Sequence, residues 1–290
     1  DLANFIFIRS IFDYGNIAPS RVFTQSLIDI YRKHPQLFIP ESIFWENLLK
    51  QSEEQQRRNL ELPLLKLAGL FRSSFRDLIN HWISIIRFLR EMCDGDARFF
   101  FERIAERLKI DLEDDFALEK VHNLLKTEDV KKKLGINFPY GDKNGRLLFS
   151  SLSNSDRGLG VLRGVRNEHL KNFNIPVDSQ IIRVSLNSGL IRIVWCESKS
   201  YRFREKEKSG RGFIMTRSEF TEPCQRAWKI IAEKLNIFPV DLDYYIWSLG
   251  SIICKRYGEL CYICPLTHLC WSWEKGSVAE SRGAKWQEGC

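Results

Sequence analysis

Four cysteines lie close together near the end of the 290-residue chain, with the spacing C-x6-C-x2-C-x5-C. Four thiolates in one short loop can hold a [4Fe–4S] cluster, because each iron of the cubane needs one soft sulfur ligand. A structural zinc site is the alternative, since four cysteines also satisfy tetrahedral Zn²⁺. Zinc ribbons, however, usually combine two separated C-x2-4-C pairs, and this loop has one. The spacing therefore favours an iron–sulfur cluster held by Cys254, Cys261, Cys264 and Cys270.

Two further segments precede these cysteines. Residues 241–250 predict a helix that leads into the first cysteine, and residues 175–184 read Ile-Pro-Val-Asp-Ser-Gln-Ile-Ile-Arg-Val. In this order, the three segments resemble the endonuclease III branch of the helix–hairpin–helix DNA glycosylases, whose Pro-Val-Asp-x-x-hydrophobic-x-Arg segment carries a catalytic aspartate. The resemblance covers about residues 175–270. It departs from the family at Ser179–Gln180, where the family has threonine and histidine.

The resemblance assigns the catalytic role to Asp178. Cleavage of an N-glycosidic bond builds positive charge at C1′ of the sugar, and a fixed carboxylate stabilises that charge or activates the attacking nucleophile. The alternative is a structural role, because Val-Asp-Ser before an apolar run is also an ordinary helix N-cap. The two roles are compatible.

Lyase activity requires a lysine whose amine attacks C1′ and forms a Schiff base. The endonuclease III pattern places this lysine in a hairpin about twenty residues before the aspartate, and no lysine stands there in this chain. Lys143 is the better candidate, since its longer separation from Asp178 is similar to the archaeal 8-oxoguanine glycosylases, which lack the cysteine loop. In that comparison Asp243 and Trp247 match a segment near the bound base. For Lys143 the alternative is an exposed lysine in a turn. For Asp243 it is an ordinary acidic residue at the start of a helix.

DNA would be held through its phosphates while one nucleotide leaves the stack. Main-chain amides between Gly141 and Gly145 are candidates for a phosphate site at a helix start. Lys255 and Arg256, inside the cysteine loop, are further candidates. The basic residues within 190–217 are interpreted as a solvated surface loop.

The remaining pattern is mainly helical. Apolar positions at three- and four-residue steps predict the helices listed last, and Gly135 is a predicted C-cap. We expect two helical lobes that flank a DNA-binding cleft, over residues 1–172 (with a candidate hairpin near 138–150) and residues 173–290. The second lobe carries the iron–sulfur loop and a small strand-like insertion at 190–217. The predicted helices cover residues 4–12, 20–33, 41–55, 60–70, 75–92, 97–108, 111–125, 128–134, 219–235 and 242–253.

Composition agrees with such a protein but does not define it. The formal net charge is +7, which suits a polyanionic partner, and the hydrophobic content of 44% allows packed cores. No apolar run approaches the roughly 20 residues of a membrane span. We expect a monomeric cytoplasmic, nucleoid-associated enzyme that excises a damaged or mismatched base from duplex DNA. A non-catalytic iron–sulfur protein that binds or senses DNA damage is the alternative.

Overall fold

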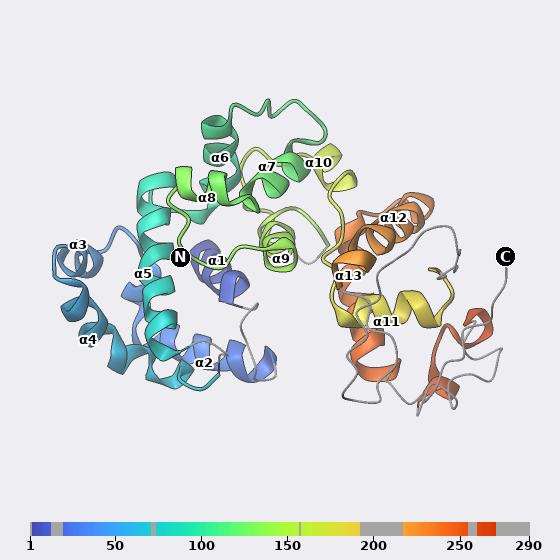
Figure 1. The fold of residues 1–290 in the computed structure, drawn as a ribbon, viewed down its shortest axis with the longest axis horizontal. Helices are drawn as coiled ribbons and strands as arrows, with labels where there is room; N and C mark the ends of the chain where they lie inside the picture. Colours follow the sequence, from blue (N-terminus) through green and yellow to red (C-terminus); the bar gives the residue numbers. More distant parts are fainter. Residues whose placement is uncertain are drawn as a thin grey trace, which may run out of the picture. The chain divides into compact units, whose positions relative to one another are not determined.

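The computed structural model describes residues 2–12, 20–70, 74–156, 158–191, 217–254 and 260–270. Over these residues the chain is mainly helical and forms no strand, which confirms the predicted mainly α class. The chain divides into two compact units, unit 1 (Asp1–Phe173) and unit 2 (Asn174–Cys290), coloured from blue to yellow-green and from yellow to red in Figure 1. No helix among the described residues is long and apolar enough to cross a membrane.

The described part of unit 1 consists of α-helices that are 5 to 18 residues long. Its α-helices are α1 (Leu2–Phe12), α2 (Ser20–Lys33), α3 (Ile43–Leu49), α4 (Glu53–Leu64), α5 (Phe75–Met92), α6 (Phe100–Leu108), α7 (Ala117–Leu125), α8 (Glu128–Lys133), α9 (Asp142–Leu152) and α10 (Asn167–Lys171). Among the described residues of unit 1, 3-10 turns lie between α2 and α3 (η2, Pro35–Phe38), between α4 and α5 (η3, Leu65–Leu67) and between α5 and α6 (η4, Ala97–Phe99).

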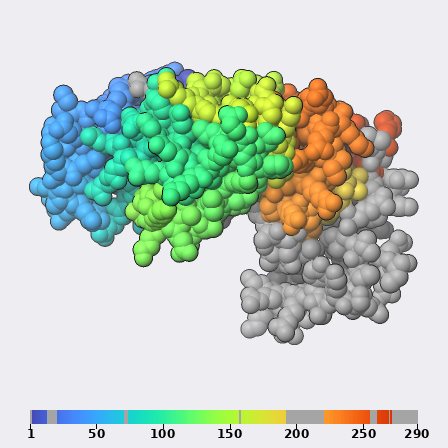
Figure 2. Space-filling view, turned by 90° about the horizontal axis from the view of Figure 1, so that it is seen from above, coloured from blue at the N-terminus to red at the C-terminus, as the bar shows by residue number. Residues whose placement is uncertain are grey.

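Aromatic rings fill the centre of unit 1. The rings of Phe7 and Phe100 pack edge to face at 5.1 Å between centroids, and those of Phe88 and Phe138 do so at 5.3 Å. All four side chains are buried, and such pairs add about 0.5–1.5 kcal/mol each to the burial of their area. The side chains close over this core as a continuous surface, blue to green in Figure 2. Phe138, in the segment before α9, also packs edge to face on Phe7 at 6.2 Å, so this segment is fixed to α1 and α5.

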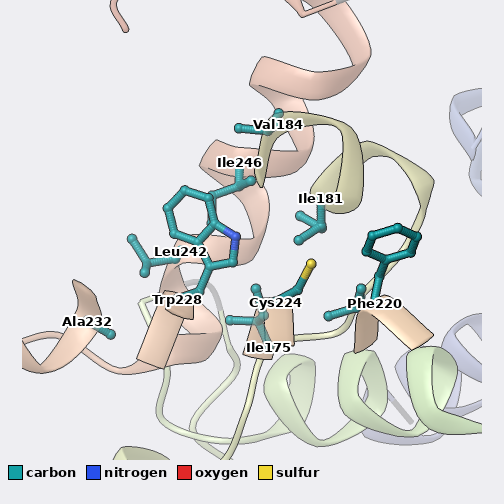
Figure 3. Close-up of a cluster of buried hydrophobic side chains, with 10 residues drawn as sticks. Ile175, Ile181, Val184, Phe220, Cys224, Trp228, Ala232, Leu242 and Ile246 are labelled. Atoms are coloured by element: carbon teal, nitrogen blue, oxygen red, sulfur yellow. The ribbon is translucent and has the colours of Figure 1, made fainter. Parts of the chain in front are cut away.

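Unit 2 is built on α11 (Ser179–Asn187), α12 (Arg217–Leu235) and α13 (Pro239–Ser248). A π-helical turn, η5 (Leu249–Ile253), follows α13, and the 3-10 turns η6 (Cys261–Ile263) and η7 (Thr267–Leu269) lie in the cysteine loop. The three α-helices supply side chains to one buried apolar cluster, which we call the unit 2 core (Figure 3). Its members are Ile175, Val177, Ile181, Val184, Phe220, Cys224, Trp228, Ala232, Leu242 and Ile246. The strand-like insertion predicted at 190–217 lies outside the described residues except at its two ends.

Gly250 is the point at which η5 packs on α11. A Cβ atom at this position would lie 2.8 Å from both the Cβ atom and the main-chain oxygen of Gln180, closer than such atoms approach. The guanidinium of Arg183 donates to the carbonyl oxygen of Gly250 at 3.3 Å, so the contact is also hydrogen-bonded. The turn after α13 is therefore held against the first turn of α11.

We expect Gly250→Ala to destabilise the protein by about 1–3 kcal/mol, because the added methyl group meets main-chain atoms that must shift. Thermal unfolding followed by circular dichroism measures the change. Ser251→Ala is the matched control, since it removes the 3.2 Å bond from Ser251 Oγ to the Ser248 carbonyl and adds no atom. We expect the control to cost about 1 kcal/mol or less. An unchanged unfolding midpoint for Gly250→Ala would contradict the tight contact.

Candidate active site

Asp178 is the N-cap residue of α11. Its Oδ1 atom accepts hydrogen bonds from the main-chain N–H groups of Gln180 at 2.8 Å and Ile181 at 3.2 Å. Ile175 and Val177, which precede it, are buried in the unit 2 core, so the chain enters the helix at a fixed angle. The aspartate itself is only 8% exposed. The capping role predicted from the sequence is confirmed, and the catalytic role remains a prediction.

The hydrogen bonds of the cap hold the Asp178 carboxylate in one orientation. Two main-chain donors fix one of its oxygens, and helix α11 is in turn fixed by packing in the unit 2 core. A negative charge that does not have to reorganise stabilises developing positive charge more effectively than a mobile one. The site can therefore support an oxocarbenium-like transition state if a sugar reaches it.

Lys143 is the second residue of α9, in unit 1, and its side chain is half-buried. The N-cap residue of this helix is Gly141, whose N–H donates to Oδ1 of Asn144 at 2.6 Å. Asn144 also donates to the Pro139 carbonyl oxygen at 2.8 Å. The predicted helix start near Lys143 is thus present, whereas the structure assigns the lysine no catalytic role.

The two candidate phosphate-binding glycines use their N–H groups inside the protein. Gly145 N–H donates to the Gly141 carbonyl oxygen at 3.0 Å, and to Oδ1 of Asn144 at 3.1 Å. A Cβ atom on Gly145 would lie 2.6 Å from the ring of Tyr140 and 2.8 Å from that of His122. Because the two rings pack this closely, a residue with a side chain does not fit at position 145, which explains the glycine. A phosphate role for Gly141 and Gly145 stays a prediction that their bonding does not support.

Asp243 and Trp247 lie on α13, which buries one face and exposes another. Leu242 and Ile246 belong to the unit 2 core, whereas Trp247 is 37% exposed and Asp243 is intermediate. The neighbouring Tyr244 and Tyr245 are exposed as well, with their rings perpendicular at 5.8 Å. This face of α13 presents flat rings that could stack against a base.

The four motif cysteines are unpaired thiols of intermediate exposure. Burial raises the pKa of the Cys261 thiol, and the charges of the other three cysteines raise it further. Within the part of the chain that the structure describes, no group of three or more His, Cys, Asp or Glu side chains is arranged to hold a metal ion. Lys255 and Arg256, inside the loop, fall outside the described residues.

Helix α11 joins the aspartate to the cysteine loop, a link that the sequence did not predict. At its C-terminal end, Asn187 Nδ2 donates to Cys254 Sγ at 3.3 Å, and the Cys270 thiol donates to the Asn187 carbonyl oxygen at 3.2 Å. Arg183 Nη1 adds a bond to the Cys254 carbonyl oxygen at 3.4 Å. Asp178 and the cysteine loop are thus held at opposite ends of one nine-residue helix. Arg183 is the arginine of the Pro-Val-Asp segment, so the motif pointed to this residue but not to its partners Gly250 and Cys254.

Residues 159–267 match the family model described as AGOG, N-glycosylase/DNA lyase. The resemblance to the helix–hairpin–helix DNA glycosylases is confirmed over this segment, on its 8-oxoguanine glycosylase-like side. The segment contains Asp178, Asp243, Trp247 and three of the four motif cysteines, while Lys143 and Cys270 lie outside it. Neither the curated proteins nor the solved structures yield a match to the chain.

Proposed function

We propose that this protein is a base-excision DNA glycosylase that also cleaves the strand as an AP lyase. The observation that carries the proposal is the position of Asp178, which is a buried, doubly hydrogen-bonded helix cap inside the segment that matches the N-glycosylase/DNA lyase family. Its substrate is duplex DNA that contains a damaged or mismatched base. The excess of basic residues, a net charge of +7, suits this polyanion.

The proposed reaction begins with rotation of the target nucleotide out of the stack, because the reacting carbon is inaccessible inside a duplex. Trp247 stacks on the everted base and Asp243 bonds its edge. The N-glycosidic bond breaks, and the base leaves with the bonding electrons and takes up a proton from water. Asp178 stabilises the positive charge at C1′. The Lys143 amine then bonds to C1′ and loses a proton, and the ring oxygen takes up a proton as the sugar ring opens to an imine. A β-elimination then removes a proton from C2′ and expels the 3′-phosphate, which breaks the strand.

The cysteine loop is proposed to hold a [4Fe–4S] cluster. The donor set fits this group, since Cys254, Cys261, Cys264 and Cys270 offer four soft sulfur ligands from one short loop. Such a cluster would fix the ends of the loop and hold Lys255 and Arg256 where they contact phosphates. A structural Zn²⁺ would serve the same purpose, and metal analysis separates the two. We place the enzyme in the cytoplasm, on the nucleoid, as a monomer.

The proposal is tested with duplexes that each carry one lesion: 8-oxoguanine, uracil, thymine glycol or mismatched adenine. In the presence of borohydride we expect the wild-type protein to form a covalent adduct with at least one duplex, because hydride reduces the imine to a stable amine. Lys143→Ala is expected to form no adduct. Lys120→Ala, which replaces an exposed lysine paired with Asp114, is the matched control and is expected to keep it.

Other outcomes of this experiment are equally informative. Abasic sites that form without an adduct would establish a monofunctional glycosylase and remove Lys143 from the mechanism. An adduct that persists in Lys143→Ala would assign the Schiff base to another amine. DNA that is bound but unchanged across the panel would overturn the proposal in favour of a non-catalytic DNA-binding protein.

A further inference from the structure

A partly buried polar network lies directly beside the start of α9. It consists of two side chains from α7, one from the segment before α9 and two from α9 itself. The members, which we call the Asp142 network, are Glu119, His122, Tyr140, Asp142 and Arg146. None of them has a part in the proposed chemistry. Burying charged groups is costly unless they are paired, so the arrangement calls for an explanation.

The charges of the network are closely matched. Arg146 is 2% exposed and binds Glu119 through two parallel hydrogen bonds, each of 2.7 Å. Its Nε atom also donates to Asp142 Oδ1 at 3.2 Å, and Lys126 donates to the same oxygen at 2.9 Å. Two carboxylates therefore face two cations. The guanidinium also lies 5.0 Å from the ring centroid of Phe173, at the end of unit 1.

His122 completes the network as a neutral group. Burial lowers its pKa to about 4, against the opposing effect of the hydrogen bond with Asp142. Its Nε2 atom lies 3.2 Å from Asp142 Oδ1 and its Nδ1 atom 3.0 Å from the Tyr140 hydroxyl. A neutral ring that donates from Nε2 to the carboxylate and accepts the Tyr140 proton at Nδ1 satisfies both contacts with one tautomer.

Asp142 stays ionised in this environment. Burial alone would raise its pKa, but the hydrogen bond from His122 and the charge of Arg146 together lower it well below the ordinary value. The carboxylate is thus a permanent acceptor for three donors that come from α7, the residue after α7, and α9 itself. This arrangement fixes the first residue of α9.

The residue on the other side of Lys143 is fixed as well. Asn144 is buried, and its side chain bonds to main-chain groups of Gly141, Pro139 and Ile11, the last of these in α1. Lys143 is therefore flanked in sequence by two residues whose side chains are turned inward and anchored. The direction in which its Cα–Cβ bond leaves the helix is set by these contacts.

We propose that the Asp142 network, together with Asn144, is a positioning device that aims the Lys143 amine at the sugar carbon. The proposal rests on the proposed role of Lys143 as the Schiff-base lysine. Covalent attack requires the reacting atoms to approach within about 3–3.5 Å, and a displacement of about 1 Å can cost on the order of 10²-fold in rate. A catalytic lysine on a loosely held turn would not meet this requirement.

Asp142→Asn tests the proposal with an isosteric change. The substrate is a duplex with a preformed abasic site, so that base removal does not enter the rate. We expect the single-turnover rate constant for adduct formation with borohydride, measured at saturating DNA, to fall about 10²-fold, while DNA affinity stays at the wild-type value. Asp29→Asn is the matched control, because Asp29 pairs with Lys66 at 2.8 Å elsewhere in unit 1. It is expected to react at the wild-type rate.

A second readout separates positioning from general destabilisation. In the Lys143→Ala background, Asp142→Asn is expected to leave the rate of base release from lesion DNA unchanged, because a positioning group has nothing left to position. A further fall in that background would overturn the proposal and show that the network acts through the fold. Equal adduct rates for wild type and Asp142→Asn would overturn it as well. A wild-type protein that forms no adduct instead removes the proposed lyase function itself.

Tyr140→Phe provides a test if Asp142→Asn does not fold. It removes one hydroxyl group and no charge, so Asp142 keeps its three donors while His122 loses its bond to Tyr140. We expect a smaller fall in the single-turnover rate constant for adduct formation, with DNA affinity unchanged. Wild-type kinetics in this variant, if it is the only one that folds, would overturn the proposal.

Discussion

Replacement of Asp178 by asparagine is expected to slow base release by about 10³-fold or more, with DNA affinity nearly unchanged. The magnitude is that of removing one preorganised electrostatic group from a transition state. Affinity should survive, because phosphate contacts dominate binding and Asp178 is too buried to contribute many of them. Single-turnover excision from lesion DNA measures the rate, and fluorescence anisotropy of labelled duplex measures the affinity.

The structural role of Asp178 dictates the controls for this experiment. Asparagine, serine and aspartate are all good N-caps, so Asp178→Asn and Asp178→Ser both retain an acceptor for the N–H groups of Gln180 and Ile181. Asp178→Ala loses the cap too and is expected to cost about 1 kcal/mol of stability. If the catalytic assignment is right, all three variants are inactive and only the alanine variant is less stable. Excision at the wild-type rate by Asp178→Asn would show that Asp178 is a cap and nothing more.

Helix ends that depend only on residues a few positions apart were predictable from the sequence. Gly135 was predicted as a C-cap, and the structure gives it a φ of 68°, in the left-handed region that glycine adopts readily. The N–H of Ile136 then bonds to the Lys131 carbonyl oxygen at 2.8 Å, as expected one residue beyond such a cap. The capping role of Asp178 was predictable for the same reason. An aspartate just before a helix bonds to main-chain N–H groups two and three residues ahead, so both partners are local in sequence.

The predicted helices over 41–55 and 111–125 were wrong at their boundaries, because side chains compete with the helix for main-chain donors. The predicted helix over 41–55 is divided at Ser52, which forms a capping box with Gln55 and starts α4. In the predicted helix over 111–125, Asp111 and Asp114 accept main-chain N–H groups two residues ahead, at 2.9 Å each. These local bonds form turns, so α7 begins only after them.

The supports of the candidate site could not be read from the sequence. The bonds from Arg183 to Gly250 and from Asn187 to Cys254 each span 67 positions. Neither pair has a spacing that distinguishes it from chance, and a hydrogen bond at such a separation follows from tertiary packing alone. The same limit applies to Gly145, which sequence spacing suggested as a phosphate ligand. In the structure its lack of a side chain makes room for Tyr140 and His122.

The purified protein is expected to be brown, with an absorbance band at about 400 nm and about four irons per chain. Cys261→Ala should lose both the band and the iron, because it removes one of the four proposed sulfur ligands. Cys224→Ala is the matched control, since Cys224 is a buried thiol of the same unit that packs in the unit 2 core, away from the motif. It is expected to keep the full iron content. Colourless protein that contains zinc would contradict the cluster.

Removal of the metal is expected to affect base release as well as the loop. Cys254 packs against the unit 2 core and bonds to Asn187, at the end of α11 opposite Asp178. Metal binding to such a loop is coupled to its folding. When the metal leaves, the free energy of binding therefore no longer stabilises the loop or the end of α11 that it contacts. We therefore expect oxidation in the presence of a chelator to lower both the unfolding midpoint and the excision rate, and Cys261→Ala to do the same. Apoprotein that excises bases at the rate of the metal-loaded form, with an unchanged midpoint, would show that the cysteine loop supports neither α11 nor the aspartate at its start.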